Sequence, residues 1–103
     1  MRETEIVKSA TFKRWFQRLR DRRAVARIDA RLRNVTFGHF GDVKSVGDGI
    51  SEMRIRHGPG YRLYFMRDGV RFVVLLCGGH KGTRTRDIER ARQLALDWGE
   101  GND

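Results

Sequence analysis

Apolar residues recur at helical spacing in two neighbouring segments near the start of the chain. In residues 10–21 the large apolar side chains are Phe12, Trp15, Phe16 and Leu19. In residues 24–38 a second stripe consists of Val25, Ile28, Leu32 and Val35. Steps of three and four residues place such side chains on one face of a helix. The pattern therefore predicts a hairpin of two helices, connected near residues 21–23.

After residue 40 the pattern changes to the alternation that is typical of strands. In residues 51–56 and 61–66, apolar side chains alternate with charged or hydroxyl-bearing ones. Because successive side chains of a strand point to opposite faces, one face of each strand is expected to pack on the core. The expected core-facing residues are Met53, Ile55, Leu63 and Phe65.

The remaining segments predict a central strand, two short strands and a last helix. The run "VRFVVLLC" over residues 70–77 is apolar on both faces, and a tight turn at 67–69 would pair it with the preceding strand. Short strands are expected over residues 3–8 and, with an edge-like composition, 41–49. A final helix is predicted from about residue 85 to residue 98.

This series of elements predicts an α+β fold with the order β-α-α-β-β-β-α. We expect an antiparallel sheet of three or four strands, packed against the N-terminal helical hairpin and a C-terminal helix, with the helices on one face. The chain has 103 residues, which is enough for one domain and one core. The domain is expected to span residues 1–98, followed by a tail over residues 99–103.

The charge balance predicts a polyanionic partner. There are 22 Lys and Arg residues against 13 Asp and Glu, a formal net charge of +9. Such a field attracts nucleic acid, an anionic membrane or an acidic protein. The longest apolar stretch is too short to span a bilayer, and the N-terminus lacks an apolar leader, which favours a cytoplasmic protein. The single cysteine, Cys77, excludes an internal disulfide.

The alternation in the two middle strands also predicts where the cations gather. The side chains on the face away from the expected core include Arg54, Arg56, Arg62 and Tyr64. Arginines on neighbouring strands lie close enough to repel one another, and only Glu52 is at hand to compensate them. We therefore expect an external anion to complete the arrangement, because guanidinium groups bind phosphate oxygens in pairs.

The segment that follows the central strand is expected to complete this cationic surface. The sequence "GGHK" at residues 78–81 would lie beside Tyr61 and Arg62, and its two glycines would let backbone N–H groups approach an anion closely. The predicted cationic patch consists of Arg54, Arg62 and Lys81, bordered by His57 or His80.

The predicted helical hairpin carries a second group of cations. Residues 13–33 contain nine basic residues and two acids. A solvated outer face, contact with a nucleic-acid backbone and docking of an acidic partner are all compatible with this segment. The cations that fall away from its apolar stripe are Lys13, Arg20, Arg27 and Arg31.

The candidate chemistry is that of cations rather than of metals. No His, Cys, Asp and Glu residues occur at metal-ligand spacing, so neither a metal nor another cofactor is expected. Cations with an imidazole or a phenol suit metal-free cleavage of RNA, in which the 2′-hydroxyl is an internal nucleophile. The protein then needs to position that hydroxyl, neutralise the phosphorane and move two protons.

Three stretches carry a resemblance to a known family. They are "FGDVKSVGDGISEMRI" (40–55), "GPGYRLYF" (58–65) and "VVLLCGGHKGTRTRDIERA" (73–91), together with the opening "FKRWFQRLRDRRAVARI" (12–28). With them the chain resembles RelE/HigB-type toxins of type II toxin–antitoxin systems, in the RelE/ParE superfamily. It is similar in particular to the phage-type group called addiction module killer proteins.

The resemblance implies a RelE-like fold and an mRNA interferase: a metal-independent endoribonuclease that cleaves mRNA, usually on the ribosome, and so arrests translation. It also implies a cognate antitoxin, commonly a small helix-turn-helix protein, and a hetero-oligomer with it. Arg62 matches the family arginine that contacts the scissile phosphate, and Lys81 falls where the family has another basic catalytic residue. Arg54 lies near a basic residue used for substrate binding or proton transfer.

The resemblance leaves the proton-transfer groups open. Some members have a catalytic tyrosine in the C-terminal segment, and this chain has none after residue 82. The candidates for acid and base are therefore His57, His80, Tyr64 and Lys81. The candidates for further RNA contacts are Lys44, Arg56, Tyr61, Arg84 and Arg86. Two other functions remain: a ParE-like toxin that inhibits gyrase, and a nucleic-acid-binding protein without catalytic activity.

Overall fold

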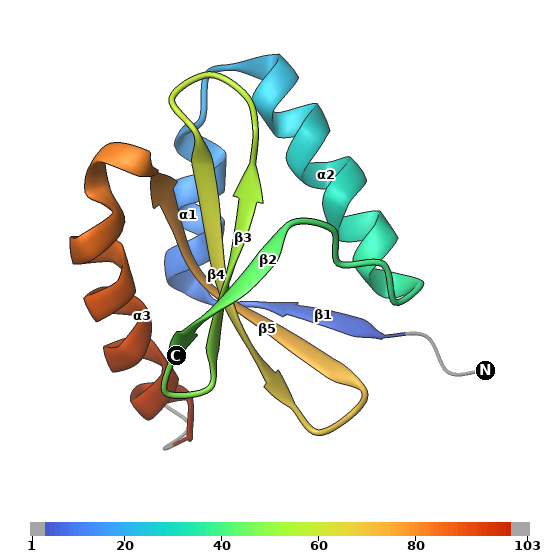
Figure 1. Cartoon of the computed structure of the whole chain (residues 1–103), viewed down its shortest axis with the longest axis vertical. Helices are drawn as coiled ribbons and strands as arrows, with labels where there is room; N and C mark the ends of the chain where they lie inside the picture. The colour runs from blue at the N-terminus through green and yellow to red at the C-terminus, as the bar shows by residue number, and fades with distance from the viewer. Residues whose placement is uncertain (1–3, 100–103) are drawn as a thin grey trace.

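The computed structural model describes residues 4–99 as a five-stranded sheet with three helices (Figure 1). The elements in chain order are β1 (Glu5–Lys8), α1 (Ala10–Arg18), α2 (Arg22–Thr36), β2 (Val43–Gly47), β3 (Ile50–Ile55), β4 (Tyr61–Asp68), β5 (Phe72–His80), the 3-10 turn η1 (Lys81–Thr83) and α3 (Arg84–Gly99). The predicted α+β fold is confirmed, and the edge-like segment forms β2, so that four strands rather than three follow the helical hairpin. Of the expected tail, Gly99 ends α3, and residues 100–103 lie outside the described residues.

The strands follow one another across the sheet in the order β1-β5-β4-β3-β2. The last four strands form an antiparallel meander, as expected, while β1 adds to the outer side of β5 in parallel. Ser9 sets the step from β1 into α1, because its hydroxyl accepts from the Phe12 N–H (2.9 Å) and donates to the Leu76 carbonyl (2.6 Å). The first helix is thereby fixed to β5 at its N-terminus.

The helices cover both faces of the sheet, and the prediction that they share one face is wrong. On the hairpin side, the predicted stripe residues Phe12, Ile28 and Leu32 pack on the four predicted strand residues. On the other side, α3 covers the sheet (Figure 1). It buries a second cluster there that includes Tyr64, Leu76 and Ile88. The physical reason lies in β5, whose apolar residues point to both faces and need cover on each.

The glycine pair after the apolar run does not form a loop. Strand β5 continues through Gly78 and Gly79 to His80, paired with the start of β4. A methyl group at Gly78 would overlap the Trp15 ring, and one at Gly79 would overlap the Asp87 carboxylate. These glycines therefore let helices approach the strand from its two sides. In residues 4–99 no helix is long and apolar enough to cross a bilayer.

Candidate functional site

A small cleft lies where β3, β4 and the end of β5 meet. Its volume is about 200 Å³, and it is lined by Arg54, Ile55, Arg56, Gly60, Tyr61, Arg62 and Lys81. Strand register explains the gathering: Arg54 pairs directly with Arg62, and Tyr61 pairs with His80, the residue before Lys81. The three cations predicted to form one patch thus line one cleft, although they come from three separate elements.

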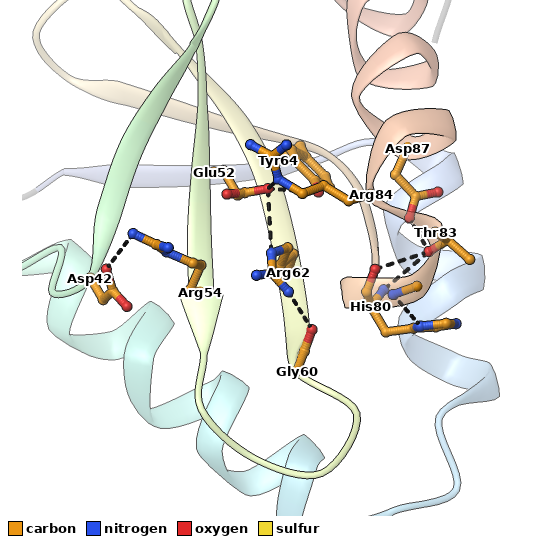
Figure 2. Close-up of polar contacts among 11 residues, drawn as sticks. Asp42, Glu52, Arg54, Gly60, Arg62, Tyr64, His80, Thr83, Arg84 and Asp87 are labelled. Carbon is orange, nitrogen blue, oxygen red and sulfur yellow. Dashed lines mark hydrogen bonds and ion pairs between the residues drawn. The ribbon is translucent and has the colours of Figure 1, made fainter.

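Arg62 is held from two sides at the floor of this cleft. Its Nη1 donates to the Gly60 carbonyl at 3.0 Å, and its Nε lies 3.4 Å from Glu52 Oε2. The second contact is an ion pair without hydrogen-bond alignment, because the buried Nε makes no hydrogen bond within the described residues. The side chain is only 13% exposed. Its position is therefore fixed by the fold, with Nη2 free of both contacts (Figure 2).

Glu52 is the buried acid that holds the cations together. It is fully buried, and its Oε2 accepts from the Tyr64 hydroxyl (3.0 Å) and from Arg84 Nε (2.8 Å) in addition to pairing with Arg62. Figure 2 shows these side chains converging between β3, β4 and the start of α3. Arg62 therefore has an internal carboxylate as a counter-charge, and the external anion expected for the crowded arginines stays a prediction.

A second acid pairs with two arginines at the end of β3 and directly after it. Asp42 lies 3.3 Å from Arg54 through one carboxylate oxygen and 3.3 Å from Arg56 through the other. The Nε of Arg54 is buried without a hydrogen-bond partner among residues 4–99, so this guanidinium is less fully satisfied than that of Arg84. The two internal acids therefore leave the rim of the cleft cationic, since Lys81 is exposed.

The two histidines predicted as acid or base candidates form hydrogen bonds outside the cleft. His57 Nε2 lies 2.9 Å from Asp21 Oδ2, and Asp21 caps the N-terminus of α2. A hydrogen bond from the Ala24 N–H, followed by the one from His57, lowers the pKa of Asp21 below its ordinary 3.8. His80 Nδ1 accepts from the Gly82 N–H at 3.1 Å. Both side chains serve to position loops around the cleft, and neither lines it.

Tyr64 is buried beneath α3 and does not face the cleft. Its side chain is 0% exposed, and its hydroxyl donates to Glu52. Burial raises the pKa of Tyr64 strongly, and the hydrogen bond to Glu52 raises it further. The prediction that Tyr64 projects from an open face is wrong, because α3 covers that face. We therefore exclude Tyr64 from the groups that could transfer a proton to a substrate.

The residues predicted to make further RNA contacts are divided over the surface. Arg56 and Tyr61 line the cleft itself. Arg84 and Arg86 line a neighbouring depression that also includes Lys81, so their surface continues the cleft around η1. Lys44 lies on β2, opposite Glu52 in the register, and outside the residues that line the cleft.

Two contacts that position Arg62 were not predicted in full from the sequence. The first comes from Glu52, which the sequence indicated only as the one acid at hand among the arginines. The second belongs to Gly60, which has a positive φ of 78° and whose carbonyl fixes Arg62. An added Cβ there would lie 3.4 Å from Arg62 Nη1, so the turn also gives the guanidinium its room. Among the described residues, no group of three His, Cys, Asp or Glu is placed to hold a metal ion.

Comparisons with known proteins place the chain among its relatives. No family model matches it. A Haemophilus influenzae protein, described as uncharacterized, is 46% identical over 95 residues, which cover 92% of this chain and 96% of that protein. The chain belongs to the same family as this protein.

A solved structure shows which fold this chain has. A chain in the crystal structure of the toxin–antitoxin complex RelBE2 from Mycobacterium tuberculosis matches with a TM-score of 0.59 and 21% identity. The match covers 79% of this chain and all of that chain. The protein therefore has a RelE-like fold, as the sequence resemblance implied.

Proposed function

We propose that the protein is the toxin of a type II toxin–antitoxin system and that it cleaves mRNA, on the ribosome, without a metal ion. The observation that carries the proposal is the cleft in which Arg54, Arg62 and Lys81 converge. A cluster of cations around a fixed arginine is suited to the phosphorane of RNA cleavage, where negative charge develops on the phosphate oxygens. The RelE-like fold and the resemblance to HigB and addiction module toxins support the same assignment.

The reaction needs no group beyond those of the RNA and the cleft. The 2′-oxygen attacks the adjacent phosphorus, its proton passes to a base, and the bond from phosphorus to the 5′-oxygen breaks as that oxygen takes up a proton. The products are a 2′,3′-cyclic phosphate and a 5′-hydroxyl. Arg62, fixed by Glu52 and Gly60, contacts the phosphate. Lys81 and Tyr61 are the lining side chains able to carry a proton.

The partner in this proposal is an antitoxin, a small helix-turn-helix protein that forms a hetero-oligomer with the toxin in the cytoplasm. The related fold was solved as a toxin–antitoxin complex. A net charge of +9 also favours an acidic partner. A short neighbouring reading frame whose product binds this chain and relieves growth arrest would support this part of the proposal.

The test compares three variants in a translation extract. Primer extension on the mRNA locates the cuts, and labelling by polynucleotide kinase without phosphatase detects the 5′-hydroxyl ends. Arg62→Ala and Lys81→Ala are each expected to lower the cleavage rate by about 10²–10³, by analogy with other donors to a developing oxyanion. Arg71→Ala is the matched control, because Arg71 is half-exposed, pairs with Glu5 and lies at the other end of β5.

The outcomes separate the proposal from its alternatives. Loss of cutting and of growth arrest in the two cleft variants, with the control unchanged, would support the nuclease. Cuts that leave 5′-phosphates would contradict the internal 2′-hydroxyl mechanism. Intact transcripts with blocked gyrase would favour a ParE-like toxin, and RNA binding without any cut would favour a non-catalytic protein.

A further inference from the structure

A second cavity adjoins the cleft on the side of α2. Its volume is about 330 Å³, and its polar lining residues are Arg27, Arg31 and Asn34 from α2, Arg54 from β3, Arg56 directly after β3, and Asp42. We call it the α2 pocket. It shares Arg54, Ile55 and Arg56 with the cleft. Cleft and pocket therefore lie on either side of the same three residues at the end of β3.

The α2 pocket carries an excess of positive charge. Four arginines line it against one carboxylate, and that carboxylate is already shared between Arg54 and Arg56. Arg31 is held by backbone carbonyls, donating from Nη1 to Arg54 (2.7 Å) and from Nη2 to Phe40 (3.0 Å). These carbonyls fix its guanidinium without neutralising its charge. An anion in the pocket would meet this uncompensated charge.

Two lining side chains are free to contact a ligand. Arg27 and Asn34 lie seven residues apart on one face of α2, and both are exposed. Within residues 4–99 neither side chain forms a hydrogen bond or ion pair with another. The Asn34 amide offers both donors and an acceptor, the combination that pairs with the edge of a nucleobase. A cation and an amide thus lie two helical turns apart on one face of α2, about 10 Å along its axis.

We propose that the α2 pocket binds a neighbouring nucleotide of the RNA strand whose scissile phosphate occupies the cleft. Arg27 contacts the phosphate of that nucleotide, and Asn34 contacts the edge of its base. This inference rests on the proposed function, since it takes the cleft as the place of the scissile phosphate. An RNA strand is favoured over an acidic peptide because the pocket continues the cleft along shared walls. Single-stranded RNA, with its bases unstacked, can enter such a pocket.

The experiment measures binding rather than cleavage. The probes are fluorescent hexanucleotides of 2′-O-methyl A, C or U, which lack the attacking hydroxyl, and anisotropy gives the dissociation constant at several salt concentrations. The variants are Arg27→Ala and Asn34→Ala, with Arg23→Ala as the control, since Arg23 is an exposed arginine of α2 outside the pocket. Thermal melts check that all three variants fold.

The two pocket variants are expected to change different properties of RNA binding. Arg27→Ala should weaken binding of every probe and make the plot of log K against log salt shallower by about 0.7, the value for one lost phosphate contact on a single strand. Asn34→Ala should leave this slope unchanged. It should reduce the preference of the wild type among the three probes by between about five- and 150-fold, the range for one base contact.

Measurements of RNA binding and of RNA cleavage together distinguish a failure of this inference from a failure of the proposed function. If the wild type cuts no RNA but the variants behave as expected, the nuclease is refuted and the RNA path stands. If the wild type cuts mRNA and both pocket variants bind the probes like Arg23→Ala, the pocket lies off the RNA path and the inference is overturned. Weaker binding of a polyglutamate peptide with unchanged RNA binding would overturn it in favour of a protein partner.

Discussion

Replacing Glu52 by glutamine tests the acid that holds the cationic cleft together. Glutamine keeps the shape of the side chain and one oxygen that can accept from the Tyr64 hydroxyl. It removes the negative charge that Arg62 and Arg84 share at 3.4 and 2.8 Å. The variant therefore leaves two neighbouring guanidinium groups without their common counter-charge, in a place where Glu52 itself is fully buried.

The expected loss comes mainly from Arg62. Removing one partner of a buried ion pair costs about 3–5 kcal/mol, because the other charge remains desolvated. The Arg62 side chain is 13% exposed, so water can compensate it only in part, and the lower end of that range applies. Arg84 is 37% exposed, and its pair contributes no more than a surface pair, about 1 kcal/mol or less. We expect a total loss of about 3 kcal/mol in the free energy of unfolding.

Urea unfolding and thermal melts measure this loss directly. In a domain of this size, about 3 kcal/mol corresponds to a fall of about 12–24 °C in Tm. Asp42→Asn is the matched control: it makes the same acid-to-amide change beside Arg54 and Arg56, which are 35% and 84% exposed, and should cost less than about 1 kcal/mol. If Glu52→Gln loses no more than the control does, Glu52 does not hold the cluster.

Two further substitutions test the packing of β5 and the cap of α2. Gly79→Ala places a methyl group against Asp87, so it should lower the free energy of unfolding by about 3 kcal/mol in urea, whereas Gly99→Ala, with open space around it, should be near neutral. Asp21→Asn keeps the helix cap but removes a carboxyl whose pKa is lowered in the folded state. Because a lowered pKa stabilises the fold above pH 3.8 and this contribution is lost as pH falls through the folded value, the urea midpoint of the wild type should fall more between pH 5 and pH 2.5 than that of the variant. Equal acid sensitivity of both proteins would contradict the lowered pKa of Asp21, which comes first from the Ala24 N–H and then from His57.

The faces of β3 and β4 could be predicted from the sequence because one of their faces packs on the helical hairpin. The alternation correctly separates Met53 and Leu63 from Arg54 and Arg62. It could not show that α3 covers part of the opposite face, because the apolar side chains of α3 do not reveal which side of the sheet they meet. For this reason the alternation predicts an exposed side chain at Tyr64, which the structure buries.

The end of β5 could not be predicted because glycine has two opposite uses. A pair of glycines usually indicates a turn or a close approach to a ligand. Here they make room for Trp15 on one side and Asp87 on the other, and both of these residues belong to helices that pack on the strand. The strand therefore runs three residues further than its apolar run, which carries Lys81 to the rim of the cleft.

The extension of β5 through its glycines gives the cleft one fixed cation and one adjustable cation. Arg62 is held by a buried carboxylate and a turn carbonyl before any substrate arrives, so its orientation costs nothing when a phosphate binds. Lys81 stands at the beginning of η1, where its backbone N–H contacts the Pro59 carbonyl while its side chain stays exposed. A cleft with one rigid guanidinium and one adjustable ammonium group can first position a phosphate and then follow the charge as it develops. In the proposed nuclease, replacing Lys81 should therefore lower the rate at saturating RNA more than it weakens RNA binding.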